Sequence, residues 1–200
     1  DYLDTNGIKI YTNLDVNAQT YLENAVTGNI KSDSDIQTSS VMVENKTGKV
    51  IALVGGKNYE KSQYNRAVYS KRQVGSTMKP FLYYAALEDG FTASSTFLSE
   101  PTTFSLENNK TYSPANFGNI YPSKPIPLLL AIAYSDNIYA VKTHLFLGED
   151  KIIDIAKKAG IKTKMEKTVS LPLGTEELNI MEMTNAYSTL ANEGVRNNLY

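Results

Sequence analysis

The stretch Arg72–Phe81, RQVGSTMKPF, decides how this chain is interpreted, because it places Ser-x-x-Lys between a glycine and a proline. Proline lacks a backbone N–H and clashes with the carbonyl four residues before it, so a helix accepts Pro80 without loss only in its first turn. Apolar residues then recur at helical spacing as far as Gly90, a residue type that commonly ends helices. The stretch therefore predicts a helix that begins close to Ser76, with Lys79 one turn further along the same face.

The predicted helix start brings together a nucleophile and a base. A serine hydroxyl is a weak nucleophile near neutral pH and needs a base within hydrogen-bond distance. The single histidine, His144, lies in an apolar helical run, and no Gly-x-Ser-x-Gly is present, so lysine is the remaining base. Burial and the helix N-terminus would both lower the pKa of Lys79 toward a usable range. The alternative is a helix cap at Ser76 and a solvated Lys79, since Ser-x-x-Lys is short and common.

A second polar cluster, Ser135-Asp136-Asn137, interrupts two apolar runs that are predicted to be helical. Polar side chains in such a place are costly unless they have partners. All three residue types are also good helix N-caps, so alone they indicate only the start of a helix. Together with Ser76 and Lys79 they favour a shared cleft, in which Ser135 relays a proton and Asn137 holds the lysine and a substrate amide.

These two clusters resemble the first two motifs of the penicillin-recognising serine enzymes. The wider sequence resembles the transpeptidase domain of a class A (bifunctional) penicillin-binding protein in four blocks: KTGKVIALVGG, NRAVYSKRQVGSTMKPF, YSPANFGN and LPLGTEELNIMEMTNAYSTLANEG. The resemblance covers nearly the whole chain. It implies an α+β fold with helices packed on an antiparallel sheet, which the order of strand-like and then helical runs also favours.

The resemblance implies a D,D-transpeptidase that cross-links peptidoglycan stem peptides ending in D-Ala-D-Ala and that β-lactam antibiotics inhibit covalently. Ser76 is then the acylated nucleophile and Lys79 its base. Ser135 is the proton relay, and Asn137 contacts Lys79 and the substrate amide. The acyl-enzyme is attacked by an amine of a neighbouring stem peptide. The residues expected to contact substrate are Gly75, Asn116, Phe117 and Tyr121.

Two short sequences imitate further motifs of the superfamily. Lys46-Thr47-Gly48 matches the third motif, but it precedes Ser76 and lies between two strand-like runs, so it is predicted to be a hairpin turn. TEELN at 175–179 resembles the Glu-x-x-Leu-Asn of class A β-lactamases, with Thr175 where those enzymes carry the glutamate that activates water. Glu176 is one residue late and, in a helix, would point about 100° away. A β-lactamase or D,D-carboxypeptidase is therefore an alternative function, and a non-catalytic penicillin-sensing domain is another.

Residues 1–200 are expected to be the N-terminal portion of one transpeptidase domain, with 1–30 as a possible lead-in from another domain. By the resemblance, the third Lys-Thr/Ser-Gly motif lies beyond Tyr200. A membrane anchor and a glycosyltransferase domain would precede Asp1. The expected location is the extracellular face of a bacterial cytoplasmic membrane. The expected partners are stem peptides, β-lactams and the remainder of the same domain.

Composition narrows the function classes further. The net charge of −1 and the pI near 5.9 give no electrostatic reason to expect nucleic-acid binding. The absence of cysteine excludes disulfides and thiolate metal sites. The sequence shows neither metal-ligand spacing nor a phosphate-binding glycine loop, so no metal and no cofactor are expected. No apolar run approaches the roughly 20 residues of a membrane span, so membrane contact is expected only through an anchor outside this chain.

Local patterns predict the remaining elements. Strands are expected at Ile8–Tyr11, Val41–Glu44 and Val50–Val54, and a second hairpin is expected to turn at Asn108-Asn109. A helix is expected from Asp15 to about Val26 with Gly28 beyond it, and Leu128–Tyr134 is expected to be buried. The later helices are expected at Asn137–Leu147, Lys151–Ala159 and Ile180–Asn192.

Overall fold

The computed structural model describes residues 7–31 and 33–200. They form two compact units. The first contains the described residues up to Ser70 together with Asn179–Tyr200, and the second contains Lys71–Leu178. Each unit combines helices with antiparallel strand pairs, which confirms the predicted α+β class.

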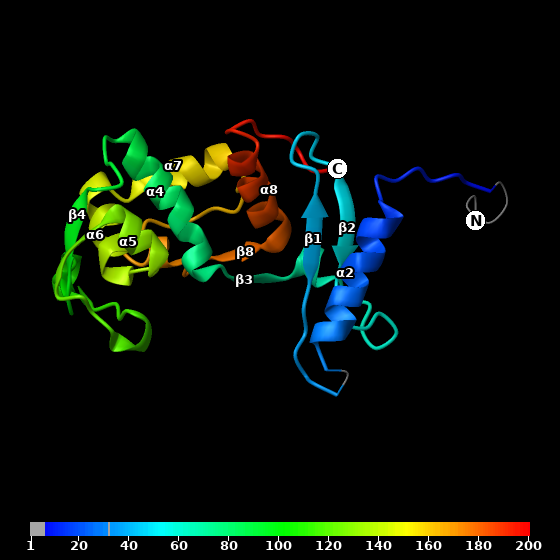
Figure 1. The fold of residues 1–200 in the computed structure, drawn as a ribbon, viewed down its shortest axis with the longest axis horizontal. Helices are drawn as coiled ribbons and strands as arrows, with labels where there is room; N and C mark the ends of the chain where they lie inside the picture. The colour runs from blue at the N-terminus through cyan, green and yellow to red at the C-terminus, as the bar shows by residue number, and fades with distance from the viewer. Residues whose placement is uncertain (1–6, 32) are drawn as a thin grey trace. The chain divides into compact units, whose positions relative to one another are not determined.

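The first unit is built on the antiparallel hairpin of β1 (Ser40–Val43) and β2 (Val50–Val54). Both strands are rich in valine, a β-branched residue that packs well on a pleated surface. Helix α2 (Val16–Asn29) contacts β2, and helix α8 (Ile180–Ala191) contacts β1. The hairpin therefore lies between two helices (Figure 1). The short helix α3 (Arg66–Tyr69) also contacts α8.

Lys46-Thr47-Gly48 lies in the turn of the β1–β2 hairpin, as predicted. The backbone N–H groups of Thr47 and Gly48 both donate to the Glu44 carbonyl, at 3.2 and 2.8 Å. Gly48 has a φ of +83°, a left-handed conformation that favours glycine. The literal Lys-Thr-Gly is thus part of a structural turn in the first unit.

The second unit carries the helices α4 (Lys79–Glu88), α6 (Asn137–Leu147) and α7 (Asp150–Ala159). Helix α4 contacts both α6 and α7, and Phe81, Leu82, Ile138 and Tyr139 are fully buried. Helix α5 (Leu128–Ala133) precedes α6. The 3-10 segments of this unit are η1 (Gly75–Met78), η2 (Glu107–Asn109), η3 (Phe117–Asn119) and η4 (Leu171–Leu173).

Short strand pairs complete the second unit. Strand β4 (Thr96–Ser99) pairs antiparallel with β7 (Lys124–Pro127). Strand β5 (Phe104–Ser105) pairs antiparallel with β6 (Thr111–Tyr112), and the turn between them contains Asn108 and Asn109 at φ +57°. That hairpin was predicted. Strand β3 (Lys71–Gln73) pairs with β8 (Glu177–Asn179).

Two predictions at the start of the chain are wrong. Ile8–Tyr11 is not a strand in the described structure, and Tyr11 is 91% exposed. An alternating pattern of side chains does not form a strand unless a neighbouring strand pairs with the backbone N–H and C=O groups of the segment. Gly28 does not follow α2 but lies inside it, because the helical hydrogen bonds continue until Ile30 N–H donates to the Val26 carbonyl.

The predicted burial of Leu128–Tyr134 is also wrong for most of the segment. Leu128 and Ala131 are buried, whereas Leu129 and Ile132 are 63% and 51% exposed. Residues three apart share a face of a helix, so one face of α5 packs inward and the rest remains at the surface.

Candidate active site

Ser76 lies at the entry to α4, as its neighbours in the sequence predicted. The 3-10 turn η1 contains Ser76, and α4 follows at Lys79 with Pro80 in its first turn. Lys79 is 3% exposed, whereas the Ser76 side chain is exposed. The turn thus presents the hydroxyl at the surface and directs the lysine into the protein.

Ser135 connects Lys79 to Ser76 through hydrogen bonds. The Lys79 ammonium donates to Ser135 Oγ at 3.0 Å, to the Ser135 carbonyl at 2.6 Å and to Asn137 Oδ1 at 2.7 Å. The Ser135 hydroxyl donates to Ser76 Oγ at 2.9 Å. The four predicted site residues therefore meet, and the hydrogen-bonded path from Lys79 to Ser76 runs through Ser135.

Burial lowers the pKa of the Lys79 ammonium from 10.5 to about 8, because desolvation disfavours its charged form. The carboxylate of Asp136 acts in the opposite direction and favours the charged lysine. Lys79 can therefore be neutral in a substantial fraction of molecules at mildly alkaline pH. A neutral amine is the form that can accept a proton.

The Ser135-Asp136-Asn137 cluster caps a helix and contributes to the site at the same time. Asp136 is the N-cap of α6, and its Oδ1 accepts from the Tyr139 N–H at 2.7 Å. Ser135 has a φ of +51°, which is uncommon for a residue with a side chain and costs free energy. This conformation occurs at the residue whose hydroxyl bridges Lys79 and Ser76.

Asn116, predicted to contact substrate, is 8% exposed, and its side chain is hydrogen-bonded within the protein. Its Nδ2 donates to Asp136 Oδ2 at 2.7 Å and to the Ile120 carbonyl at 3.2 Å. Its Oδ1 accepts from the Asn137 N–H at 2.8 Å. Ser99, also buried, donates to Asp136 Oδ2 at 2.5 Å. These contacts engage both ends of the Asn116 amide, and a direct contact with substrate stays a prediction.

The other expected substrate contacts are more open. Phe117 is 95% exposed, and Phe117 and Tyr121 line a cavity of about 570 Å3 beside the cluster, together with Asn116, Tyr134 and Asp136. Gly75 has a φ of +58°, and its N–H donates to the Gly174 carbonyl at 3.0 Å. The Gly75 N–H is thus engaged within the protein.

The TEELN segment precedes α8 and does not lie in a helix, so the helical direction considered for Glu176 does not apply. Thr175 follows η4 in an irregular segment, and strand β8 begins at Glu177. Thr175 Oγ1 lies 3.1 Å from Ser170 Oγ. The Glu176 carboxylate accepts from the Glu166 N–H at 3.3 Å. Neither contact provides Thr175 with a basic group.

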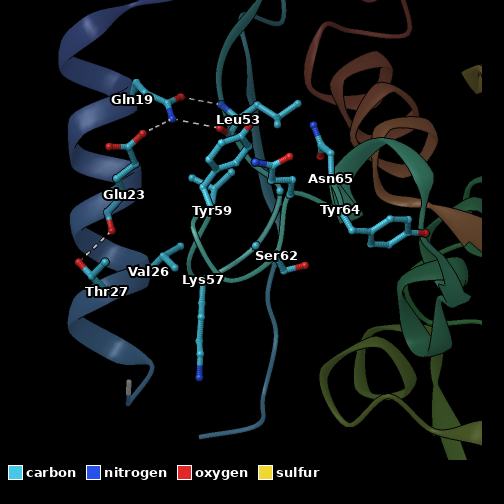
Figure 2. Close-up of a pocket in the computed structure, with 14 residues that line it drawn as sticks. Gln19, Glu23, Val26, Thr27, Leu53, Lys57, Tyr59, Ser62, Tyr64 and Asn65 are labelled. Atoms are coloured by element: carbon cyan, nitrogen blue, oxygen red, sulfur yellow. Dashed lines mark hydrogen bonds between the residues drawn. The ribbon is translucent and has the colours of Figure 1, made fainter. Parts of the chain in front are cut away.

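A second cavity, of about 490 Å3, lies in the first unit between α2 and the segment that follows β2 (Figure 2). Its Gln19 side chain accepts from the Leu53 N–H at 2.8 Å and donates to the Leu53 carbonyl at 3.0 Å. This amide thus pairs with the edge of β2 as a neighbouring strand would. None of the predicted site residues lines this cavity.

Within residues 7–31 and 33–200, no three His, Asp or Glu side chains gather in a way that could hold a metal ion. The helices of the same residues are all too short or too polar to cross a bilayer.

The chain is similar to known penicillin-binding proteins in sequence. Residues 38–200 match the penicillin-binding protein transpeptidase domain. Penicillin-binding protein 2D of Bacillus subtilis is 46% identical over 195 residues, which cover 97% of this chain and 28% of that protein. Penicillin-binding protein 1A of Pseudomonas aeruginosa is 38% identical over 82% of this chain and 20% of that protein. The chain thus spans less than a third of the length of these relatives.

Solved structures show the same similarity. Penicillin-binding protein 1A from Haemophilus influenzae is 34% identical to this chain and superposes on it with a TM-score of 0.73. The match covers 78% of this chain and 23% of the Haemophilus influenzae chain. The PonA1 protein from Mycobacterium tuberculosis in complex with penicillin V is 22% identical. It matches 99% of this chain and 55% of its own with a TM-score of 0.83, a likeness of fold. The chain therefore belongs to the penicillin-binding protein transpeptidase domain family, in agreement with the class A resemblance predicted from its motifs.

Proposed function

We propose that this chain supplies the acylation half of a D,D-transpeptidase site, with Ser76 as the nucleophile that carries the acyl group. Family membership supports a penicillin-binding transpeptidase role in general. The observation that carries the serine mechanism is the path from buried Lys79 through Ser135 Oγ to exposed Ser76 Oγ, with contacts of 3.0 and 2.9 Å. A buried lysine with a lowered pKa, linked to a serine, is the arrangement that makes a hydroxyl nucleophilic.

In the proposed acylation step, neutral Lys79 accepts the proton of Ser76 through Ser135. The Ser135 hydroxyl now donates to Ser76 and accepts from the Lys79 ammonium. When Lys79 is neutral, both hydroxyls can turn, so that Ser76 donates to Ser135 and Ser135 donates to Lys79 Nζ. Ser76 Oγ then attacks the carbonyl carbon of the penultimate D-Ala.

The same residues return the proton as the bond breaks. The tetrahedral intermediate collapses to an ester on Ser76, the amide C–N bond breaks, and the terminal D-Ala amine leaves with the proton held by Lys79. An amine of a second stem peptide then attacks the ester and releases Ser76 as a hydroxyl. A β-lactam reacts at its ring amide in the same way, but its amine stays attached to the acyl group, which leaves a slowly hydrolysed ester.

Asn137 holds the lysine and remains able to contact substrate. Its Oδ1 accepts from Lys79 at 2.7 Å, and its Nδ2 donates to the Ala115 carbonyl at 2.6 Å. An amide nitrogen has two hydrogens, so the second can donate to a substrate carbonyl. The Ser76 backbone N–H at the start of the helix would stabilise the developing oxyanion, with a second donor from the third-motif strand beyond Tyr200.

The hydrolytic alternatives are less favoured, because a hydrolase needs a base that activates water against the ester. Thr175 has no such group, and its hydroxyl lies beside Ser170. The whole protein is proposed to be bifunctional, with a glycosyltransferase domain and a membrane anchor outside this chain. It would act on the extracellular face of the cytoplasmic membrane, on peptidoglycan stem peptides.

Turnover of a D-Ala-D-Ala peptide donor with an amine acceptor tests this proposal in the full-length protein. We expect amide product and released D-Ala in equal amounts, and neither from Ser76→Ala. Release of D-Ala with water as the main acceptor would identify a carboxypeptidase. Acylation by penicillin without any turnover of peptide donors would identify a sensing domain.

A further inference from the structure

Beneath the proposed catalytic residues lies a buried pair of an amide and a carboxylate. Asn116 comes from the segment between β6 and η3, and Asp136 is the N-cap of α6. The two are 8% and 3% exposed, and Asn116 Nδ2 lies 2.7 Å from Asp136 Oδ2. Ser99 at the end of β4 is fully buried and donates to the same oxygen. Such a network is stabilising only while every member keeps its partner.

The other end of the Asn116 amide holds the start of α6. Asn116 Oδ1 accepts from the backbone N–H of Asn137 at 2.8 Å and of Ile138 at 3.4 Å. The preceding residue contributes as well, because the Ala115 carbonyl accepts from Asn137 Nδ2 at 2.6 Å. With Nδ2 held by Ala115, Asn137 Oδ1 is the atom that faces Lys79. The Ala115 carbonyl therefore determines which end of the Asn137 side-chain amide faces Lys79. The Asn116 side chain holds the backbone of the same residue.

The same contacts secure the Ser135 turn. Ser135 precedes Asp136 directly and holds an unfavourable left-handed conformation. A conformation of this kind persists only where the surrounding structure fixes it. Asp136 is held at Oδ1 by the Tyr139 N–H and at Oδ2 by Asn116 and Ser99, so the residue after Ser135 is fixed on both oxygens.

We propose that Asn116 is a positioning residue for acylation: its amide joins Asp136 to the first turn of α6 and so holds Ser135 and Asn137 against Lys79. The proposal rests on the proposed function, because it assigns Asn116 a part in the Ser76 reaction. In this role Asn116 acts through other residues; it also lines the cavity that contains Phe117 and Tyr121, so the test must separate positioning from a substrate contact. Loss of its amide is expected to displace Ser135 and Asn137 relative to Lys79. Misplacement of about 1 Å can cost about 10²-fold in rate.

The charge of Asp136 gives the network a second effect that can be measured. The carboxylate favours the charged form of Lys79 and opposes the lowering of its pKa by burial. Tyr83 on α4 and Tyr139 on α6 lie near the same groups, but burial raises both of their pKa values, that of Tyr139 to about 12, so both are neutral near pH 8. The acylation rate is expected to rise with pH as Lys79 loses its proton, and this rising part of the pH–rate profile is its acidic limb. Neutralising Asp136 should therefore move the acidic limb to lower pH.

The test is the kinetics of penicillin acylation in the full-length protein, resolved into a binding constant and an acylation rate constant across pH 6–10. For Asn116→Ala we expect the acylation rate constant to fall about 10²-fold with little change in the binding constant. A substrate contact would show the reverse pattern, weaker binding with an unchanged rate constant. Asn24→Ala is the matched control, since Asn24 is an exposed asparagine inside α2, where alanine is well tolerated.

A charge exchange keeps the test decisive if Asn116→Ala does not fold. Asp136→Asn alone should slow acylation and shift its acidic limb to lower pH. Adding Asn116→Asp restores one amide and one carboxylate across the 2.7 Å contact, and it should recover much of the rate and move the limb back up. If Asn116 has a purely structural role, the exchange would restore the melting temperature without restoring the acylation rate constant.

The outcomes separate the two proposals. If the parent protein acquires penicillin on Ser76 while Asn116→Ala reacts at the parent rate constant, the positioning role is overturned and the proposed function stands. A charge exchange that leaves both the rate and the limb at the Asp136→Asn values would also overturn it. If the folded parent protein acquires no penicillin on Ser76, the proposed function fails and this inference fails with it.

Discussion

The backbones of Gly75 and Gly174 are in direct contact one residue before Ser76. The Gly75 N–H donates to the Gly174 carbonyl at 3.0 Å, and the two residues have φ values of +58° and +70°. A Cβ added to Gly174 would lie 2.0 Å from the Gly75 carbonyl oxygen and 2.3 Å from its nitrogen. Backbone atoms cannot move aside as a flexible side chain can, so only glycine fits at position 174.

Gly174→Ala should therefore displace the turn that carries Ser76. The substitution adds a backbone clash to a left-handed conformation, which alone costs about 1–3 kcal/mol. We expect a lower melting temperature and penicillin acylation slowed by about 10²-fold. Gly90→Ala is the matched control, because Gly90 also has a positive φ, of +94°, but no atom lies within 4 Å of its added Cβ. Equal acylation rates in the two variants would contradict a role of the contact in placing Ser76.

The lowered pKa of Lys79 predicts the pH dependence of acylation. Below about pH 8 the lysine is mostly protonated and cannot accept the Ser76 proton, so the rate should rise tenfold per pH unit and level off above pH 8. Lys79→Ala should slow acylation by about 10²–10⁴-fold and abolish this limb. Stopped-flow acylation by a chromogenic β-lactam measures both. The exposed Lys164→Ala is the control, and a Lys79→Ala protein that reacts at the parent rate would rule out the lysine as base.

Ser135→Ala tests the relay separately from the base. The hydroxyl joins Lys79 to Ser76 at 3.0 and 2.9 Å, so its loss should slow acylation by about 10²-fold or more. The acidic limb should persist, because burial of Lys79 remains the main cause of its lowered pKa. Ser123→Ala is the matched control, since Ser123 is exposed and has a similar φ of +50°. Rapid acylation of Ser135→Ala would mean that Lys79 reaches Ser76 without the relay.

Much of the site could be predicted because its signals are local. Pro80 after Ser-x-x-Lys sets the start of α4, and glycine at position 48 marks the hairpin turn. The contacts that orient the site could not be predicted in this way. Asn116 reaches Asp136 across 20 residues, and Gly75 meets Gly174 from a distant segment. Each residue alone is consistent with an ordinary loop.

The strands that were missed have a similar explanation. The pairings β3–β8 and β4–β7 join short segments that are far apart in the sequence and carry no hairpin signal. The exposed residues of α5 were misassigned because a continuous apolar run does not reveal which face will be covered. Asn116 was predicted only as a substrate contact, because no local signal indicates its pairing with Asp136.

The central claim is that Ser76 forms a covalent acyl-enzyme, and the intact mass of the full-length protein after incubation with penicillin tests it most directly. We predict a gain of one penicillin mass per protein, located by digestion on the peptide that contains Ser76, lasting for hours and absent in Ser76→Ala. An adduct that clears within seconds would contradict the transpeptidase assignment in favour of a hydrolase. A folded protein that gains no mass, or gains it on another residue, would contradict the assignment of Ser76 as the nucleophile.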